Sequence, residues 1–453
     1  MSQTAAHRST STTSAPPAPG RHARRRILGG GSALGAVLAL AACGGQSEGG
    51  GTQEAKDITV SYMTDWNSGA RAEYIKQAFP KFTAENPKIK VDVVNATGDS
   101  KQIALANSAA GTLADTMLAG GDLPLLLARN GDMKDIAPLL KSLKVKLDDL
   151  VYTPSTIMSE GKQYGLPFQF VVHALAMNKT MFKQRSLALP TDKTTYPQLL
   201  ETVSKLARPS ESIYGLGTDR QIFVWAPYVW GWGGEVISKD LKKTLIDEPP
   251  AREALQVWYD AMLRTEIATP MDDKGGWPKG VDFANGNVAV APKGSPGAAL
   301  DQQIAGKFEW EVMYHPLGPK SGKRMVAAAD APNIVSAQAA KRGQFEQAVK
   351  LVTWLSTSKI AQDLMLEIGP NAWPVLKTVL NSPKYLAGPP PGAKVLVDQI
   401  PNFREIPNFV GQLEWRNEIQ TALLTAFTNQ KSLPDATRDA ARAGDVVLAK
   451  YTK

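Results

Sequence analysis

From Ile58 onward, short apolar runs alternate with segments whose apolar residues recur at helical spacing. This alternation constrains the fold more than any other feature of the chain. Residues 58–63 have the pattern of a strand, and the next segment places Tyr74, Ile75 and Phe79 on one face of a helix. Such alternation predicts an α/β domain whose first sheet is mainly parallel.

The same criteria can be applied along the rest of the chain, which contains no internal repeat. Pro80 lies inside the first expected helix, where a proline kinks or interrupts the helix. We expect strands over residues 58–63, 89–94, 116–118, 170–177, 288–291 and 326–335. We expect helices over residues 72–84, 102–110, 123–128, 196–207, 251–264, 297–304, 344–355, 359–368 and 413–429.

The N-terminal segment has the pattern of an export signal. Three arginines and an Ile-Leu pair occupy residues 24–28, and a short, glycine-rich, weakly apolar run follows over residues 29–42. That run is shorter than the roughly 20 apolar residues that span a membrane, so a cleaved signal peptide over residues 1–42 is expected. The adjacent arginines resemble a twin-arginine signal, and a Sec signal remains the alternative.

Cys43 is the single cysteine in 453 residues, so the chain cannot form an internal disulfide or a cysteine-type zinc site. It ends the sequence Leu-Ala-Ala-Cys, which resembles a bacterial lipobox, and we expect its thiol to carry a lipid. Residues 43–56 are rich in Gly, Ser and Gln and are expected to form a flexible tether. The folded part would then begin near Asp57, on the outer face of a cytoplasmic membrane.

Charge argues against a nucleic-acid partner. The formal net charge is +8, but the first 43 residues carry five arginines and no acid, which leaves +3 for the rest. A body of this size with so small an excess has no electrostatic reason to bind nucleic acid or acidic membranes.

Catalytic and metal-binding patterns are absent from the sequence. His173 and His315 each stand alone, and we expect His173 to be a core histidine because it lies in an apolar strand. Ser295 does not form a G-x-S-x-G nucleophile elbow, because Lys293 stands where the first glycine should be. We therefore predict no catalytic residue, metal or cofactor, although sequence alone leaves a glycosidase-type carboxylate pair open.

Tryptophans are the most informative side chains. Trp258 and Trp354 lie on apolar helix faces and are expected in the core, whereas most of the others stand beside Gly, Asn, Pro or charged residues in expected loops. An exposed indole offers a flat apolar wall for sugar rings, although such a residue can also close the end of a core. We expect at least two members of this set to contact a ligand: Trp66, Trp225, Trp230, Trp277, Trp373 and Trp415.

Several short motifs occur in a familiar order. Trp66-Asn67 follows the first strand, and Tyr-Gly-Leu-Pro at residues 164–167 is followed by Met-Asn-Lys at 177–179. Further matches are Asn-Gly-Asp-Met-Lys-Asp-Ile at 130–136 and Phe-Ala-Asn-Gly-Asn-Val-Ala at 283–289. Over residues 57–430 the chain resembles the family 1 extracellular solute-binding proteins of ABC importers, the relatives of maltose-binding protein. It departs from that pattern at Ala114 and at Ser295-Pro296, so the ligand cannot be copied from a relative.

The resemblance implies a two-lobe α/β fold of the type II periplasmic-binding-protein class, with mixed sheets, flanking helices and a ligand cleft at a hinge. One lobe would comprise residues 57–167 and 328–372, and the other residues 168–327 and 373–453. The implied function is a monomeric, non-enzymatic receptor that captures a sugar or oligosaccharide, closes around it and delivers it to an ABC permease in the membrane.

Position within that pattern also suggests ligand-binding residues. They follow the first or third strand, lie at a crossing between lobes, or belong to the aromatic segment of the second lobe. The expected set is Trp66, Asn67, Asp122, Gln169, Phe223, Trp225, Trp230, Asp330, Trp373 and Arg404.

Other ligands and functions stay open. A phosphorylated polyol would require clustered arginines or a helix N-terminus, and no clear cluster is evident. A polyamine would require acids among the aromatics, which Asp65, Asp115 and Asp122 could supply; a peptide is a further alternative. A secreted glycosidase or esterase would turn its ligand over. A surface scaffold would show repeats.

Overall fold

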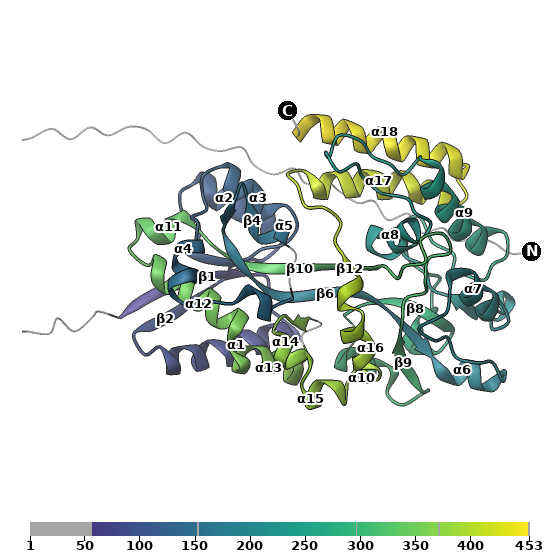
Figure 1. Cartoon of the computed structure of the whole chain (residues 1–453), viewed down its shortest axis with the longest axis horizontal. Helices are drawn as coiled ribbons and strands as arrows, with labels where there is room; N and C mark the ends of the chain where they lie inside the picture. The colour runs from purple at the N-terminus through teal and green to yellow at the C-terminus, as the bar shows by residue number, and fades with distance from the viewer. Residues whose placement is uncertain (1–56, 152–153, 296, 370–371, 452–453) are drawn as a thin grey trace, which may run out of the picture. The chain divides into compact units, whose positions relative to one another are not determined.

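The computed structural model describes residues 57–151, 154–295, 297–369 and 372–451, which belong to one compact unit (Figure 1). The expectations for residues 1–56, including the export signal and the lipid on Cys43, lie outside the described residues. None of the helices in the described ranges is long and apolar enough to span a bilayer.

Most of the strands in the described part form one mixed sheet in the order β2-β1-β3-β10-β6-β8-β7. Strands β9 and β11 also pair with β6, and β12 pairs with β10. The strands are β1 (Ile58–Thr64), β2 (Ile89–Asn95), β3 (Thr116–Leu118), β4 (Met158–Ser159), β5 (Lys162–Gln163), β6 (Gly165–Asn178), β7 (Tyr214–Leu216), β8 (Val288–Gly294), β9 (Trp310–Met313), β10 (Val326–Val335), β11 (Trp373–Pro374) and β12 (Phe403–Arg404).

Helices cover both faces of this sheet. They are α1 (Gly69–Glu85), α2 (Ser100–Ala109), α3 (Leu123–Arg129), α4 (Ala137–Ser142), α5 (Pro154–Ile157), α6 (Lys179–Gln184), α7 (Tyr196–Ser204), α8 (Ile222–Gly231), α9 (Pro249–Leu263), α10 (Ala298–Ile304), α11 (Ala337–Lys341), α12 (Phe345–Thr357), α13 (Lys359–Ile368), α14 (Lys377–Leu380), α15 (Pro383–Leu386), α16 (Ala393–Asp398), α17 (Gln412–Phe427) and α18 (Leu433–Tyr451).

Two long strands run through the middle of the sheet and belong to both of its halves (Figure 1). The first part of β6 pairs antiparallel with β10, from Gly165 opposite Ile334 to Val172 opposite Ala328. The last part of β6 pairs antiparallel with β8 and β9. Strand β6 therefore leaves one half of the sheet and enters the other without a break, and β10 returns beside it.

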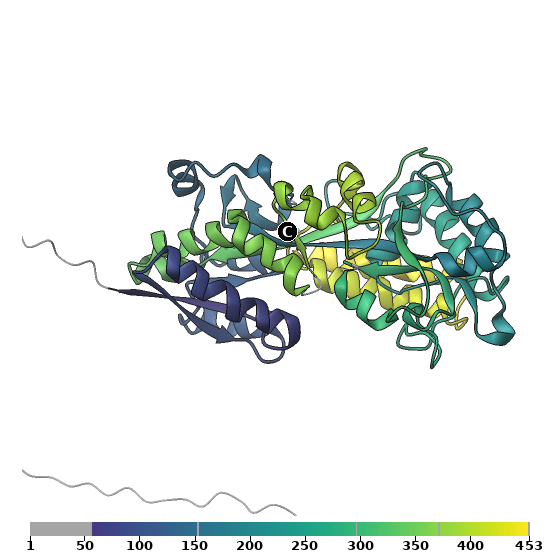
Figure 2. The same cartoon turned by 90° about the horizontal axis from the view of Figure 1, so that it is seen from below.

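In the first half, β1 pairs parallel with both β2 and β3, as the alternation predicted. The antiparallel insertion of β10 beside β3 makes the sheet mixed. Buried residues of α1, α12 and α13 pack on one face, and those of α2 and α3 pack on the other. Viewed from below, the purple helix α1 lies in front of the strands (Figure 2).

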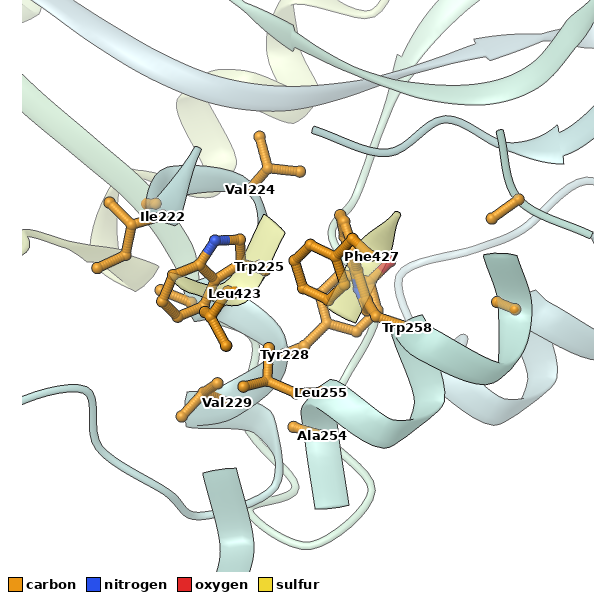
Figure 3. Close-up of a cluster of buried hydrophobic side chains, with 14 of the residues drawn as sticks. Ile222, Val224, Trp225, Tyr228, Val229, Ala254, Leu255, Trp258, Leu423 and Phe427 are labelled. Atoms are coloured by element: carbon orange, nitrogen blue, oxygen red, sulfur yellow. The ribbon is translucent and has the colours of Figure 1, made fainter. Parts of the chain in front are cut away.

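In the second half, α8, α9, α17 and α18 pack on one face around the largest of the apolar clusters. Figure 3 shows part of this cluster, in which Trp225 of α8 lies among Ile222, Val229 and Leu423. The opposite face packs against α10, α14 and α16. The four clusters divide near the middle of β6 and β10, in keeping with two lobes, while the lobe boundaries proposed above stay a prediction.

Trp225 and Trp230 were expected to lie in loops, and that expectation is wrong because both belong to α8. Nearly every residue of this helix is buried, so the apolar residues show no one-sided periodicity. Pro227 lies inside the helix and made the segment look still less helical.

Candidate functional site

The strand alternation of β6 separates its side chains between the two faces of the sheet. Phe168 and Phe170 point to one face, and the Phe170 ring stacks on Phe403 with centroids 5.4 Å apart. Gln169 and His173 therefore point to the other face, which in the second half carries α8 and α17. The polar residues on this face come from segments that are far apart in the sequence.

On this face, an imidazole, a phenyl ring and a guanidinium lie together. The His173 and Phe223 rings stack nearly parallel, with centroids 4.8 Å apart and an interplanar angle of 7°. The Arg416 guanidinium carbon lies 4.8 Å from the centre of the Phe223 ring, a cation–π geometry. Burial lowers the pKa of Arg416, while the nearby charge of Asp122 acts in the opposite direction. We call His173, Phe223, Arg416 and Asp122 the Arg416 cluster.

Asp122 connects the first half of the sheet to the segment before α17. It is 1 % exposed and precedes α3, yet its carboxylate does not cap that helix because both oxygens have other partners. Lys101 Nζ donates to Oδ1 at 2.7 Å, and the Gly411 amide donates to Oδ2 at 2.9 Å. Asn408 Nδ2 adds a bond to the Gly121 carbonyl at 2.9 Å. Asp122 thereby ties the β3–α3 turn to the start of α17.

Local structure fixes both partners of Asp122. Asp99 caps α2 by accepting bonds from the amides of Lys101 and Gln102, which places Lys101 in the first turn of that helix. Gly411 has φ +90°, and a Cβ there would come within 2.2 Å of the Tyr451 ring. Only glycine fits this position at the entrance to α17.

A polar cavity of about 430 Å³ lies beside Asp122. One wall comes from α2 and α3, and the other comes from α17 and the end of α18. Its lining includes Gln102, Glu414, Asn417 and Glu418, which can exchange hydrogen bonds with hydroxyl groups. The volume of the cavity falls within the size range of small-molecule sites, and it would increase if the two walls moved apart.

A second arginine lies near the crossing with a different set of partners. The Arg404 guanidinium carbon is 4.5 Å from the centre of the Trp230 ring, and the guanidinium forms an ion pair with Glu235. Strand β12 holds Arg404 opposite Ala327 of β10. The charge of Arg404 is thus balanced by Glu235, and its guanidinium lies over the Trp230 ring beside the crossing.

Several buried polar atoms in this region have no hydrogen-bond partner among the described residues. They are Gln169 Oε1, Trp230 Nε1, Gln412 Oε1 and Arg416 Nε. Unsatisfied buried groups are uncommon in folded proteins, and each requires an explanation. These four atoms belong to β6, α8 and α17, and other such atoms lie elsewhere in the described residues, for example on Trp66 and Asn333.

Of the ten residues expected to bind ligand, five lie around this face: Asp122, Gln169, Phe223, Trp230 and Arg404. The structure brings Asp122 and Phe223 into one cluster with Arg416 and places Gln169 four residues before His173 on the same face of β6. Asn67 is exposed and donates from Nδ2 to the Ala96 carbonyl at 3.1 Å, on the first half of the sheet.

Trp66 does not form the exposed wall that was expected, because it is 1 % exposed. Its ring packs edge-on against Tyr74 and at a tilt against Phe168, with centroids 5.4 Å and 5.1 Å away. Both neighbours belong to the core under α1 and α13. The indole of Trp66 is therefore part of this core, although the sequence pattern predicted it in a loop.

Trp225, Trp373 and Asp330 are also buried, contrary to the exposed positions expected for the two indoles. Trp225 Nε1 donates to the Arg220 carbonyl at 3.0 Å. Trp373 and Asp330 both lie opposite Phe170 in the register, so they share its face and not that of Gln169. Trp258 and Trp354, expected in the core, are indeed buried.

Sequence reasoning missed His173 and Arg416 as members of the cluster. The apolar strand predicted a core histidine at position 173, and His173 is partly buried against Phe223. The helix expected over residues 413–429 is confirmed as α17, and it contains both Trp415 and Arg416. The helical pattern alone gave no signal that Arg416 would lie beside Phe223.

The two buried histidines predict a pH-dependent stability. Burial lowers the pKa of His173 and of His315 to about 4, and His315 Nε2–H donates to the His173 carbonyl at 2.7 Å. Between pH 6.5 and 4 the unfolded chain therefore binds protons that the native protein does not. The free energy of unfolding should be highest above pH 6.5 and fall as the pH drops through this window, by up to about 3 kcal/mol for His315.

Thermal unfolding between pH 6.5 and 5 tests this, because most carboxylates stay ionised over that interval. His315→Gln should flatten the decline of the melting temperature relative to the unmodified protein. An equal decline in the two proteins would contradict the assignment.

Comparisons with known proteins give a consistent result. A sequence model of the bacterial extracellular solute-binding proteins matches residues 66–362. A curated relative named as a binding protein in Brucella abortus is 24 % identical over 209 residues, which is 45 % of this chain and 49 % of the relative. The match thus spans about half the length of that curated protein.

Solved structures share the fold over most of both chains. An ABC substrate-binding protein from Listeria monocytogenes in complex with cycloalternan is 18 % identical, with a TM-score of 0.74 over 86 % of this chain and 98 % of that one. The sugar-binding protein MalE from Xanthomonas citri is 16 % identical, with a TM-score of 0.74 over 87 % and 98 %. UgpB from Mycobacterium tuberculosis in complex with glycerophosphocholine is 17 % identical, with a TM-score of 0.71 over 87 % and 99 %.

Proposed function

Because the chain belongs to the bacterial extracellular solute-binding protein family, we propose that it captures a sugar or oligosaccharide between its lobes and delivers it to an ABC permease. No bond in the solute would be made or broken. The solute would be held on the face of β6 that carries the Arg416 cluster, next to the bond between Asp122 and the start of α17.

The observation that carries the proposal is the set of buried polar atoms without partners at Gln169, Trp230, Gln412 and Arg416. A sugar presents hydroxyl groups that both donate and accept, so it can satisfy an amide oxygen, an indole N–H and a guanidinium N–H together. Phe223, which stacks on His173 and lies beneath the Arg416 guanidinium, would hold both groups in place beside the sugar.

Hinge closure follows from the way the halves are joined. The bond from the Gly411 amide to Asp122 joins the first half of the sheet to a segment that enters the second half. A solute that contacts both sides binds the closed form better than the open one, and it shifts the equilibrium by that difference in affinity. The closed form would then dock on the permease.

The ligands of similar structures favour a carbohydrate. The Listeria protein is in complex with cycloalternan, and other neighbours are described as bound to maltose and to α-D-tagatose. The Mycobacterium protein, with glycerophosphocholine, favours the alternative of a phosphorylated polyol. All of these are at most 21 % identical, so they support the ligand class through the shared fold alone.

The remaining parts of the proposal rest on the sequence. Export through residues 1–42, a lipid on Cys43 and a tether over 43–56 would hold a monomeric receptor at the outer face of the cytoplasmic membrane. The lobes would comprise residues 57–167 with 328–372, and residues 168–327 with 373–453.

The first experiment is a ligand panel read by tryptophan emission and melting temperature. Mono- and oligosaccharides, glycerol phosphates and polyamines would each be titrated, and the solute would be recovered afterwards. A saturable shift with a sugar that is recovered intact is expected. A shift only with a phosphate or an amine would replace the ligand class, and a consumed solute would make the protein an enzyme.

Phe223→Ala should weaken binding of the identified sugar about tenfold, because an aromatic contact is worth about 0.5–1.5 kcal/mol beyond its buried area. Phe345→Ala is a matched control, because Phe345 is also partly buried and also lies under a cation. The Lys134 ammonium is 4.5 Å from its ring centre, and Phe345 itself lies at the start of α12, away from the Arg416 cluster. Isothermal titration should give an unchanged Kd for the control. Equal affinity in the two variants would remove Phe223 from the site.

A further inference from the structure

Three basic side chains lie around the crossing, and they differ in whether a carboxylate neutralises them. Lys101 pairs with Asp122, and Arg404 pairs with Glu235. Among the described residues, no carboxylate forms an ion pair with Arg416, and its Nε has no hydrogen-bond partner. Arg416 therefore differs from the other two in having no ion-pair partner among the described residues, although the carboxylates of Asp122 and Glu418 lie in the same region.

Asp122 does not supply the missing counterion, although it lies near enough for its charge to act on Arg416. Oδ1 is occupied by the Lys101 ammonium at 2.7 Å, and Oδ2 is occupied by the Gly411 amide at 2.9 Å. Glu414 lies two residues before Arg416 in the same helix, α17. Its carboxylate accepts hydrogen bonds from Lys450 and Tyr451.

The positive charge of Arg416 cannot be removed by deprotonation, because arginine stays protonated in proteins. Arg416 is partly buried, its Nε has no hydrogen-bond partner, and the cation–π contact with Phe223 offsets only part of the cost of removing the guanidinium from water. An anionic group of a bound solute could serve as the ion-pair partner of Arg416.

We propose that the solute carries an anionic group, a carboxylate or a phosphate, that pairs with Arg416. This rests on the proposed function, since the anion belongs to the captured solute. The solute is then an acidic carbohydrate, a uronate-type or phosphorylated sugar. Its ring would lie beside Phe223, and its charged group would accept hydrogen bonds from the guanidinium, which suits carboxylates and phosphates through its forked donors.

The test uses matched neutral and acidic sugars on the full chain: glucose against glucuronate and glucose 6-phosphate, galactose against galacturonate, and a disaccharide against its oxidised acid. The acidic member is expected to bind at least about tenfold more tightly, since hydrogen bonds to charged groups contribute about 1.5–3 kcal/mol. The carboxylate and phosphate arms identify which anion the site takes.

Arg416→Gln should abolish that preference, with neutral and acidic members binding equally. Arg264→Gln is the control: Arg264 also lies over an aromatic ring, 5.9 Å from the Tyr259 centre, but is exposed and paired with Asp260. Arg416→Met supplies a second readout, because removing an unpaired buried charge should raise or preserve the melting temperature of the unliganded protein while the acid preference is lost. A purely structural Arg416 would instead lower the melting temperature.

The outcomes separate the two proposals. A neutral sugar that binds as tightly as its acid overturns the inference about the anion and leaves the sugar receptor in place. A preference for acids that survives in Arg416→Gln also overturns it. Failure of every sugar, neutral and acidic, overturns the proposed function together with the inference.

Discussion

Replacing Trp225 by alanine is expected to lower the free energy of unfolding by about 3–5 kcal/mol, the usual cost of truncating a buried tryptophan. The indole is 0 % exposed and packs in the cluster of α8, α9 and α17 (Figure 3). Its Nε1 donates to the Arg220 carbonyl, so alanine removes a hydrogen bond as well as packing. Urea unfolding measures the effect.

Two comparisons show whether Trp225 acts through the core. Trp225→Phe keeps an aromatic ring in place and should cost clearly less than alanine. Trp277→Ala, at a partly buried indole, should also cost less. If Trp225→Ala left stability unchanged and abolished ligand binding, the indole would be a contact residue and the core assignment would be wrong.

The second large effect is expected at Asp115, which sequence reasoning kept as a possible polyamine ligand. Asp115 is 1 % exposed, and its carboxylate accepts hydrogen bonds from the Ser61 amide and hydroxyl at 2.9 Å and 2.7 Å. Arg342 Nη1 donates to its other oxygen at 2.7 Å. Asp115→Ala should lower the free energy of unfolding by about 3–5 kcal/mol, because it removes three hydrogen bonds accepted by a buried carboxylate.

Asp439→Ala is the matched control, since Asp439 pairs with Lys431 at the surface and such pairs contribute about 0–1 kcal/mol. Arg342→Met in the Asp115→Ala background should recover part of the loss, and the double-mutant cycle gives the coupling energy. A small effect of Asp115→Ala, with reduced affinity for a cationic solute, would return Asp115 to the list of ligand contacts.

The secondary structure was predictable wherever local pattern and final burial agree. Helix α13 begins and ends at the expected residues because one of its sides is apolar, and strand β10 does so because nearly all of its residues are buried. Helix α8 could not be predicted in this way. A helix buried on nearly every side has no polar face, so its periodicity vanishes although its burial is greatest.

The site was predictable only in part. Asp122 and Phe223 follow from position along the chain. Arg416 becomes their neighbour only because the segment before α17 returns to the β3–α3 turn, a contact between residues nearly 300 positions apart, as with Gly411 and Asp122. Trp66 illustrates the opposite error, because an indole next to a polar residue can still point inward to Tyr74 and Phe168.

The place of β10 in the sheet has a consequence for how the chain acquires its structure during synthesis. Strand β10 lies between β3 and β6 but follows β3 by about 200 residues, so the contact order of this pairing is high. Until β10 leaves the ribosome, the facing edges of β3 and β6 remain open to other chains. The half of the molecule that is made first is therefore completed late, and fragments ending before Val326 should require a chaperone to stay soluble.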